Sequence, residues 1–186
     1  SGRTFVDVGA NSGYYSLTAM SHGAERVLAV EANPEMCRRL EFNAQASGFL
    51  DRIDVCQVAL GDREGTADLL LLGGDQGSNR IARGAEVGER IAVPMKTLLS
   101  LLQEKNIERI DAMKIDVEGM EEAVLLPFFD EAPQSLWPTS MIIEYVQQND
   151  WEIDLLAQLK KLGYASMGRT RSNELLRLRP AAKPST

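Results

Sequence analysis

Acidic side chains stand at three places where a run of apolar residues gives way to a turn. Asp7 lies in FVDVGANSG, Glu31 in VLAVEANP and Asp116 in MKIDVEGM. If each run is a strand of a parallel sheet, the acids lie toward its carboxyl edge, where such sheets bind ligands. A glycine turn from a strand into a helix also lets backbone amides approach a ligand closely. These features predict a binding site for a nucleotide-type ligand.

The turn after the first run has Gly9 and Gly13 on either side of a short loop. A dinucleotide-binding loop has the pattern G-x-G-x-x-G, but here Asn11 and Tyr14 occupy the second and third glycine positions. The sequence therefore disfavours pyrophosphate binding and a nicotinamide-dependent oxidoreductase. A glycine turn with a purely structural role is the other interpretation.

The acid that closes the second run, Glu31, follows the glycine loop by about twenty residues, a spacing typical of an acid that binds both ribose hydroxyls. A solvated carboxylate at a strand end is the alternative. Asp7 and Glu31 together favour a nucleoside site more than either residue does alone.

The third acidic position belongs to a charged cluster. Lys114, Asp116 and Glu118 fall at the carboxyl end of a buried strand, where alternation predicts that Met113 and Ile115 are buried and that the charged groups point to the rim. A ligand site and a structural ion-pair network both account for this pattern.

The elements that position these residues follow from hydrophobic spacing and turn signals. Strands are predicted over 4–8, 26–30, 53–60, 66–72, 90–93, 111–116 and 141–145, and helices over 14–21, 34–47, 97–105, 120–129 and 150–162. A terminal hairpin pairs 164–167 with 175–178. The alternation predicts an α/β three-layer sandwich, in which helices cover both faces of a mainly parallel sheet.

The segment from Gly73 to Glu89 is glycine-rich and polar, and is predicted to be a loop. Gln76, Ser78, Asn79 and Arg80 could bind a hydroxyl-rich or acidic molecule there. A flexible connector is the alternative.

Composition limits the remaining possibilities. The 186 residues predict one domain over 1–180 with a tail over 181–186, and the first strand begins so early that an excerpt of a longer chain is one interpretation. Twenty basic against 27 acidic residues give a net charge of −7, which disfavours nucleic acid as a partner despite a modest basic stripe over 169–179. Cys37 and Cys56 are predicted to be buried free thiols. The chain has no long apolar run and no recognisable signal peptide, so we expect a cytoplasmic protein that does not bind membranes.

Four segments, in their order and spacing, resemble the FkbM family of S-adenosylmethionine-dependent methyltransferases. They are FVDVGANSGYYSL, VLAVEANP, ALGDREG at 59–65 and KIDVEGMEEAVL, and the resemblance covers roughly residues 4–145. It implies a class I methyltransferase (Rossmann-like) fold, with a mostly parallel seven-stranded sheet and an antiparallel last strand. It also implies S-adenosylmethionine as cofactor and S-adenosylhomocysteine as its product.

The resemblance also implies a set of cofactor-binding residues. The methionine end would be lined by Asp7, Gly9, Asn11 and Gly13, the ribose held by Glu31 beside Ala32, the adenine packed around Val58, Ala59 and Leu60, and the methyl group approached by Asp116.

Methyl transfer to a hydroxyl requires alignment of the acceptor oxygen, exclusion of water and removal of a proton. The resemblance therefore suggests an O-methyltransferase acting on a sugar, glycan or secondary metabolite. Candidate catalytic residues are Asp116, Glu118 and Lys114, with Glu144 as a third possible base, and candidate substrate-binding residues are Tyr14, Ser78, Asn79, Arg80 and Glu144.

Several alternatives stay open at this point. The domain could bind the cofactor without catalysis, and it could act alone or as a homodimer. Asp116, Glu118 and Glu144 could hold magnesium or calcium, although a site without metal is favoured. His22 is expected at the surface or as a helix cap, and Trp137 and Trp151 are expected to be packing residues.

Overall fold

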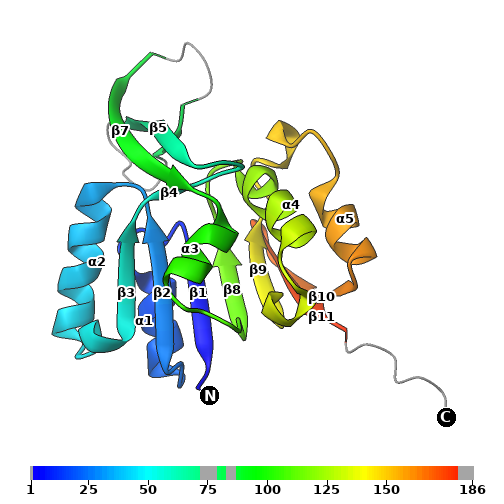
Figure 1. Ribbon diagram of the computed structural model, residues 1–186, viewed down its shortest axis with the longest axis horizontal. Helices are drawn as coiled ribbons and strands as arrows, with labels where there is room; N and C mark the ends of the chain where they lie inside the picture. Colours follow the sequence, from blue (N-terminus) through cyan, green and yellow to red (C-terminus); the bar gives the residue numbers. More distant parts are fainter. Residues whose placement is uncertain (1, 72–78, 83–86, 180–186) are drawn as a thin grey trace.

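The computed structural model describes residues 2–71, 79–82 and 87–179, and its main sheet has the strand order β10-β11-β9-β8-β1-β2-β3 (Figure 1). The neighbours from β9 to β3 pair in parallel, whereas β11 is antiparallel to both β9 and β10. This confirms the expected α/β class with a mostly parallel seven-stranded sheet and an antiparallel C-terminal hairpin. The strands are β1 (Thr4–Val8), β2 (Arg26–Glu31), β3 (Ile53–Gln57), β8 (Ala112–Ile115), β9 (Ser140–Glu144), β10 (Tyr164–Arg169) and β11 (Asn173–Leu178).

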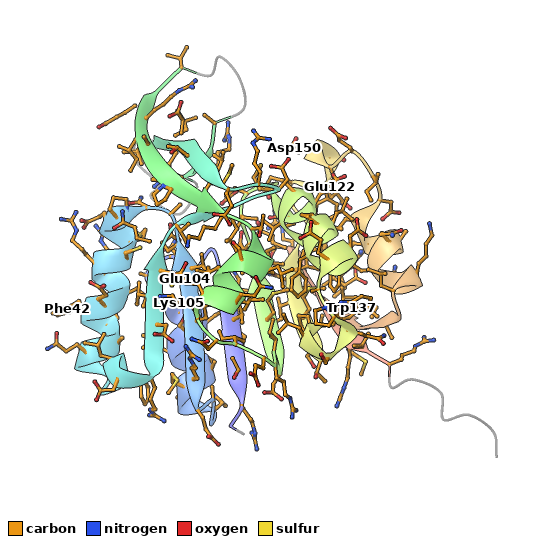
Figure 2. All side chains as sticks on the ribbon, in the orientation of Figure 1. Phe42, Glu104, Lys105, Glu122, Trp137 and Asp150 are labelled. Carbon is orange, nitrogen blue, oxygen red and sulfur yellow. The ribbon has the colours of Figure 1, made fainter. Side chains whose placement is uncertain are left out.

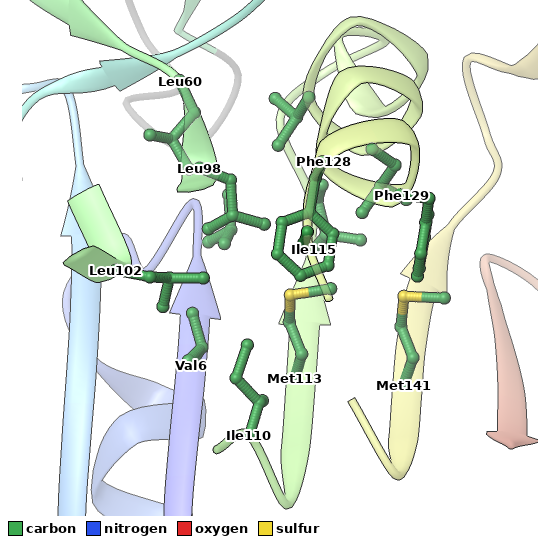
Figure 3. Packing of buried hydrophobic residues seen from close by; sticks show 14 of the residues in the cluster. Val6, Leu60, Leu98, Leu102, Ile110, Met113, Ile115, Phe128, Phe129 and Met141 are labelled. Carbon is green, nitrogen blue, oxygen red and sulfur yellow. The ribbon is translucent and has the colours of Figure 1, made fainter. Parts of the chain in front are cut away.

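Helices cover both faces of this sheet because the buried residues of each strand alternate. On one face, Phe5 and Val27 pack with Leu40 and other residues of the first two helices. On the opposite face, Val6 and Leu28 pack with the later helices. Figure 3 shows Phe128 and Phe129 of α4 facing Met113, Ile115 and Met141 on the strands. The helices are α1 (Tyr14–Ser21), α2 (Pro34–Ala46), α3 (Leu98–Glu104), α4 (Glu121–Glu131) and α5 (Leu155–Lys161), with short 3₁₀ turns η1 (Leu50–Arg52), η3 (Gln134–Leu136) and η4 (Gln148–Asp150).

Capping residues set where two of the helices begin. The Asn33 side chain accepts a hydrogen bond from the Glu35 amide, and Pro34 is the first helical residue of α2, as predicted. The prediction for the last helix was wrong at its start, because α5 begins at Leu155 and not at Asp150. The Asp154 carboxylate accepts from the Ala157 amide and caps the helix, so Asp150 is left in a separate 3₁₀ turn.

A second sheet stands over the carboxyl edge of the main one (Figure 1). Two of its strands match those predicted over 66–72 and 90–93, but their separation from the main sheet was not predicted. Its order is β4-β7-β5-β6, and its strands are β4 (Ala59–Leu60), β5 (Gly65–Leu71), β6 (Arg80–Ile81) and β7 (Glu89–Lys96). The predicted strand over 53–60 divides after Gln57, because Ala59 pairs with Met95 of β7. The predicted loop is also partly wrong, since Arg80–Ile81 pairs with β5. This sheet forms a wall above the parallel strands.

Some expectations concern residues outside the described ranges. These are Gln76, Ser78 and the tail over 181–186. Among the described residues, no helix is long and apolar enough to cross a bilayer.

Candidate active site

A cavity of about 300 Å³ lies between the carboxyl ends of the parallel strands and the second sheet. It brings together most of the predicted site residues, from segments far apart in the sequence. Those that line it are Gly9, Asn11, Tyr14, Glu31, Ala32, Val58, Ala59, Leu60, Asn79, Arg80, Lys114, Asp116 and Glu118. Three predicted residues, Asp7, Gly13 and Glu144, are not among the described residues that line it.

The loop after β1 forms the floor of this cavity, and Gly9 permits its close approach to the loop after β8. Gly9 has a φ of 75°, and a Cβ atom there would lie 1.8 Å from the Asp116 carbonyl oxygen. Asn11 also adopts a left-handed conformation, with a φ of 50°, which asparagine tolerates better than most residues. Its amide donates to Glu31 Oε2 over 2.8 Å. The loop therefore holds the Glu31 carboxylate in place.

Asp7 and Gly13 support the loop from outside the cavity, which differs from the expectation that they line it. Asp7 points to the α1 face of β1, where it is fully buried and its Oδ2 accepts from Ser16 Oγ over 2.6 Å. Burial raises the pKa of Asp7, and its Oδ1 has no hydrogen-bond partner among the described residues. Gly13 has a φ of 93°, and a Cβ atom there would lie 2.9 Å from Leu40 Cγ. Gly13 thus allows α1 to start against α2.

Glu31 presents a nearly enclosed carboxylate to the cavity. Its Oε1 accepts from the Asn33 amide and its Oε2 from the Asn11 amide, each over 2.8 Å. Burial raises the pKa of Glu31, while these amides oppose the rise. Each carboxylate oxygen has a second lone pair with which it could accept a further hydrogen bond. Glu31 is therefore suited to bind a pair of vicinal hydroxyls.

Apolar side chains form a wall of the cavity near this carboxylate. Val58 and Leu60 come from the segment after β3, and Leu69 and Ile81 come from the second sheet. Leu69 and Ile81 were not predicted as site residues, because the sequence does not show that β5 and β6 cover the site. A buried carboxylate and a nearby apolar wall fit a nucleoside, whose ribose is polar and whose base is flat and apolar.

At the end of β8 and β9, Asp116, Glu118 and Glu144 form an acidic cluster. One carboxylate oxygen from each lies within 4.8 Å of the other two. Lys114 Nζ donates to Asp116 Oδ2 over 2.8 Å and lies 4.9 Å from the centre of the Tyr15 ring. The Lys114 side chain lies beside Tyr15 of α1 and is only 5% exposed, but it lines the cavity at the carboxyl edge. An ion pair is therefore part of the cluster.

Glu144 differs from the other acids in its protonation. Burial raises its pKa to about 8, together with a hydrogen bond to Asp116 and the negative charges of Asp116 and Glu118, whereas Lys114 opposes the rise. A raised pKa favours the protonated form of Glu144 beside Asp116. Asp116 lines the cavity and remains the member of this pair that a bound molecule can reach.

Glu118 is held in a left-handed backbone conformation, with a φ of 52°, and Gly119 follows with a φ of 93°. Such a conformation is strained for a residue with a side chain, and it occurs most often at functional sites. Gln147 Nε2 donates to Glu118 Oε2 over 2.7 Å. No signal in the sequence indicated that Gln147 reaches this loop.

The remaining candidates lie outside the cavity wall. His22 is exposed at the C-terminus of α1, where its Nδ1 is 2.8 Å from the Thr18 carbonyl oxygen, so it caps the helix as expected. Trp137 and Trp151 pack against the larger core cluster, and Figure 2 shows Trp137 far below the start of α4. Both tryptophans are packing residues. Cys37 and Cys56 are buried and free, as predicted.

The sheet order and the antiparallel hairpin are those of the class I methyltransferase (Rossmann-like) fold. Residues 7–166 match the family described as the methyltransferase FkbM domain, and the chain belongs to that family. The expected family is therefore confirmed, and its description is that of a methyltransferase domain.

Individual relatives agree with this class. A ribosomal protein L11 methyltransferase from Alteromonas mediterranea is 43% identical over 54 residues, which make up 29% of this chain and 18% of that relative. The crystal structure of a ribosomal protein L11 methylase from Lactobacillus delbrueckii subsp. bulgaricus has a TM-score of 0.51 at 18% identity, and the match covers 96% of this chain and 72% of that one. An O-methyltransferase from Bacillus cereus, in complex with S-adenosylhomocysteine, has a TM-score of 0.52 at 14% identity, with coverage of 96% and 74%. At these identities the structural likeness shows a shared fold.

Proposed function

We propose that this domain is an S-adenosylmethionine-dependent O-methyltransferase that acts on a hydroxyl of a sugar, glycan or secondary metabolite. The observation that carries the proposal is the cavity of a methyltransferase-family domain at the carboxyl edge of the main sheet, with the Glu31 carboxylate at the end of β2 and an acidic cluster at the ends of β8 and β9. The first could hold a nucleoside and the second could receive a proton.

The chain's own residues fit the methyl donor S-adenosylmethionine, which supplies an activated methyl group when bound. Glu31 would accept hydrogen bonds from the ribose hydroxyls, and Val58, Leu60, Leu69 and Ile81 would enclose the adenine. The amides and carbonyls of the loop that contains Gly9 are close enough to the cavity to contact the methionine end. Direct cofactor contacts for Asp7 and Gly13 stay predictions, since both support the loop from behind.

At the acidic end, the residues could align a hydroxyl and remove its proton. Asp116 would accept the proton, Lys114 would hold the Asp116 carboxylate in its orientation, and Glu118 would accept a second hydrogen bond from the acceptor. Glu144 would lower the negative charge of the cluster, because its raised pKa favours its protonated form. Carboxylates accept hydrogen bonds from hydroxyls readily, which supports a hydroxyl-bearing acceptor.

The mouth of the cavity offers further polar contacts. Asn79 and Arg80 line it from the second sheet, and Tyr14, which is 73% exposed, lines it from the start of α1. These residues could select the acceptor. Ser78 stays a prediction because it lies outside the described residues.

A protein acceptor is a second candidate, because the segment shared with ribosomal protein L11 methyltransferases reaches 43% identity. The deciding experiment incubates the domain with S-adenosylmethionine carrying a labelled methyl group and with separate pools of glycans, small hydroxylated metabolites, ribosomal proteins and RNA. We expect label in a hydroxyl-bearing small molecule or glycan. Label in protein or RNA alone would overturn the proposed acceptor class, and cofactor binding without any labelled product would indicate a non-catalytic domain.

A further inference from the structure

Glu121, in the first turn of α4, is a buried acid that the proposed chemistry does not use. It is 1% exposed and is not among the described residues that line the cavity. Its Oε1 accepts from the Val117 amide over 2.9 Å and the Gly119 amide over 3.3 Å, and its Oε2 accepts from Trp151 Nε1 over 3.0 Å. Burying a carboxylate is energetically unfavourable unless both of its oxygens accept hydrogen bonds. The surrounding donors are therefore needed to hold Glu121 in this position.

The two amides that bind Oε1 belong to the loop between β8 and α4, on either side of Glu118. This loop carries Asp116 and Glu118 into the cavity wall, and it includes two successive left-handed residues, Glu118 and Gly119. The strained conformation at Glu118 persists only if its surroundings hold it. Glu121 supplies that support, because one carboxylate oxygen fixes the backbone before and after the strained residue.

The other oxygen of Glu121 connects this loop to the one after β9. Trp151 and Gln147 both belong to that second connection, and Gln147 Nε2 donates to Glu118 Oε2. The two loops are therefore joined at two points. Together with the end of β9 they carry all three members of the acidic cluster, Asp116, Glu118 and Glu144.

We propose that Glu121 is a positioning residue of the methyl-transfer site, which fixes the loop after β8 and so sets the arrangement of the three carboxylates. The inference rests on the proposed function only in assigning those carboxylates to methyl transfer.

The neighbouring residue Glu122 provides a matched control. Its Oε2 accepts from the Glu152 amide over 2.6 Å, so it ties α4 to the segment after β9 without holding the Val117 and Gly119 amides. Figure 2 labels Glu122 at the upper end of α4. Glu122→Gln thus removes an equal charge from the same turn of the helix.

The test compares Glu121→Gln and Glu122→Gln in protein free of cofactor, by amide hydrogen exchange and by NMR titration of the Glu144 carboxyl. In Glu121→Gln we expect exchange at Val117 and Gly119 to become about tenfold faster or more. The charged groups that face Glu144 are Asp116, Glu118 and Lys114. Burial raises the pKa of Glu144 most, and the nearby Asp116 and Glu118 raise it further. The same variant should therefore lower the pKa of Glu144, whereas Glu122→Gln should change neither quantity.

Turnover supplies the functional measurement once the acceptor pools have given a substrate. We expect Glu121→Gln to lower kcat about tenfold or more, with a smaller change in the affinity for S-adenosylhomocysteine. If Glu121→Gln does not fold, Glu121→Asp replaces it, because the shorter side chain keeps the negative charge but draws the carboxylate back from the two amides. Wild-type exchange and an unchanged pKa of Glu144 in the folded variant would overturn the proposal. Failure of the wild-type protein to bind S-adenosylhomocysteine would instead contradict the proposed function, and the cofactor-free measurements would still test Glu121.

Discussion

Glu31 is the residue on which cofactor binding depends most directly. Its carboxylate is held by two backbone amides and lines the cavity, so it is oriented before any ligand arrives. We expect Glu31→Ala to weaken S-adenosylhomocysteine binding by about 1.5–3 kcal/mol, the usual contribution of hydrogen bonds to a charged acceptor. Isothermal titration calorimetry measures this change. Glu35→Ala, which removes a carboxylate paired with Arg38 and Arg39 outside this cavity, is the control; equal affinities in all three proteins would remove Glu31 from the site.

Asp116 is the cavity-lining member of the carboxyl pair. Asp116→Asn keeps the size of the side chain but cannot take a proton, so we expect methyl transfer to slow by about 10²-fold or more, the usual effect of losing a general base. Single-turnover assays with the identified acceptor measure the rate. Full activity in Asp116→Asn would show that another group removes the proton.

The raised pKa of Glu144 makes stability depend on pH. The folded protein keeps the Glu144 proton up to about pH 8, whereas an ordinary glutamate loses it near pH 4.5. Because the folded state binds more protons in this interval, the free energy of unfolding should fall as the pH rises from about 4.5 to about 8.

Thermal unfolding across this pH range tests the assignment. Asp7 and Glu31 also have raised pKa values and contribute in the same direction. The informative quantity is therefore the difference between the wild type and Glu144→Gln, which should be more stable relative to the wild type at pH 8 than at pH 5. Parallel curves for the two proteins would show that Glu144 titrates normally.

At this scale the sequence predicted which residue types form the site better than it predicted their roles. Asp116 and Glu31 could be identified because each ends an apolar run. Gln147 and Glu121 could not, because their contacts join loops about 30 residues apart and depend on tertiary structure.

Among the elements, the loop after β1 comes very close to the backbone that follows β8, at Gly9 and Asp116. A Cβ atom on Gly9 would meet the Asp116 carbonyl oxygen at 1.8 Å, and the φ of 75° is itself unfavourable for alanine. Gly48 has a similar φ of 71° but no neighbour within 4 Å of an added Cβ. We therefore expect Gly48→Ala to cost about 1–2 kcal/mol of stability, the left-handed penalty alone, and Gly9→Ala to cost clearly more.

Urea denaturation of the two variants measures this difference. Equal losses of stability in Gly9→Ala and Gly48→Ala would show that the backbone near Asp116 can move away without cost.

The elements of the main sheet could be predicted because their alternating apolar residues lie against helices on both faces. The sequence did not show that β5 and β7 belong to a separate second sheet. The apolar residues from Ile53 to Leu60 read as one strand, and only pairing between Ala59 and Met95, 36 residues apart, decides that the chain leaves the main sheet. The start of α5 was predicted too early, at residue 150, because Asp150 and Asp154 are both residues that can cap a helix.

For the whole molecule, the arrangement of two sheets explains why one cavity contains residues from most of the chain. The main sheet supplies charged groups at its carboxyl edge, and the second sheet supplies Leu69, Arg80 and Ile81 as a cover. The order of motifs along the sequence was sufficient to predict the family, which the match over residues 7–166 confirms. The acceptor could not be predicted in the same way, because Asn79 and Arg80, which are proposed to contact it, lie outside the four segments that resemble the family.

The proposed function requires the cavity to bind the methyl donor. Calorimetric titration of the domain with S-adenosylhomocysteine, with NADH as a parallel control, tests it most directly. We expect saturable binding of S-adenosylhomocysteine, no binding of NADH, and a higher unfolding temperature in the presence of the first ligand, because a ligand bound only by the folded state stabilises it. Binding of NADH alone, or of neither ligand, would contradict the account.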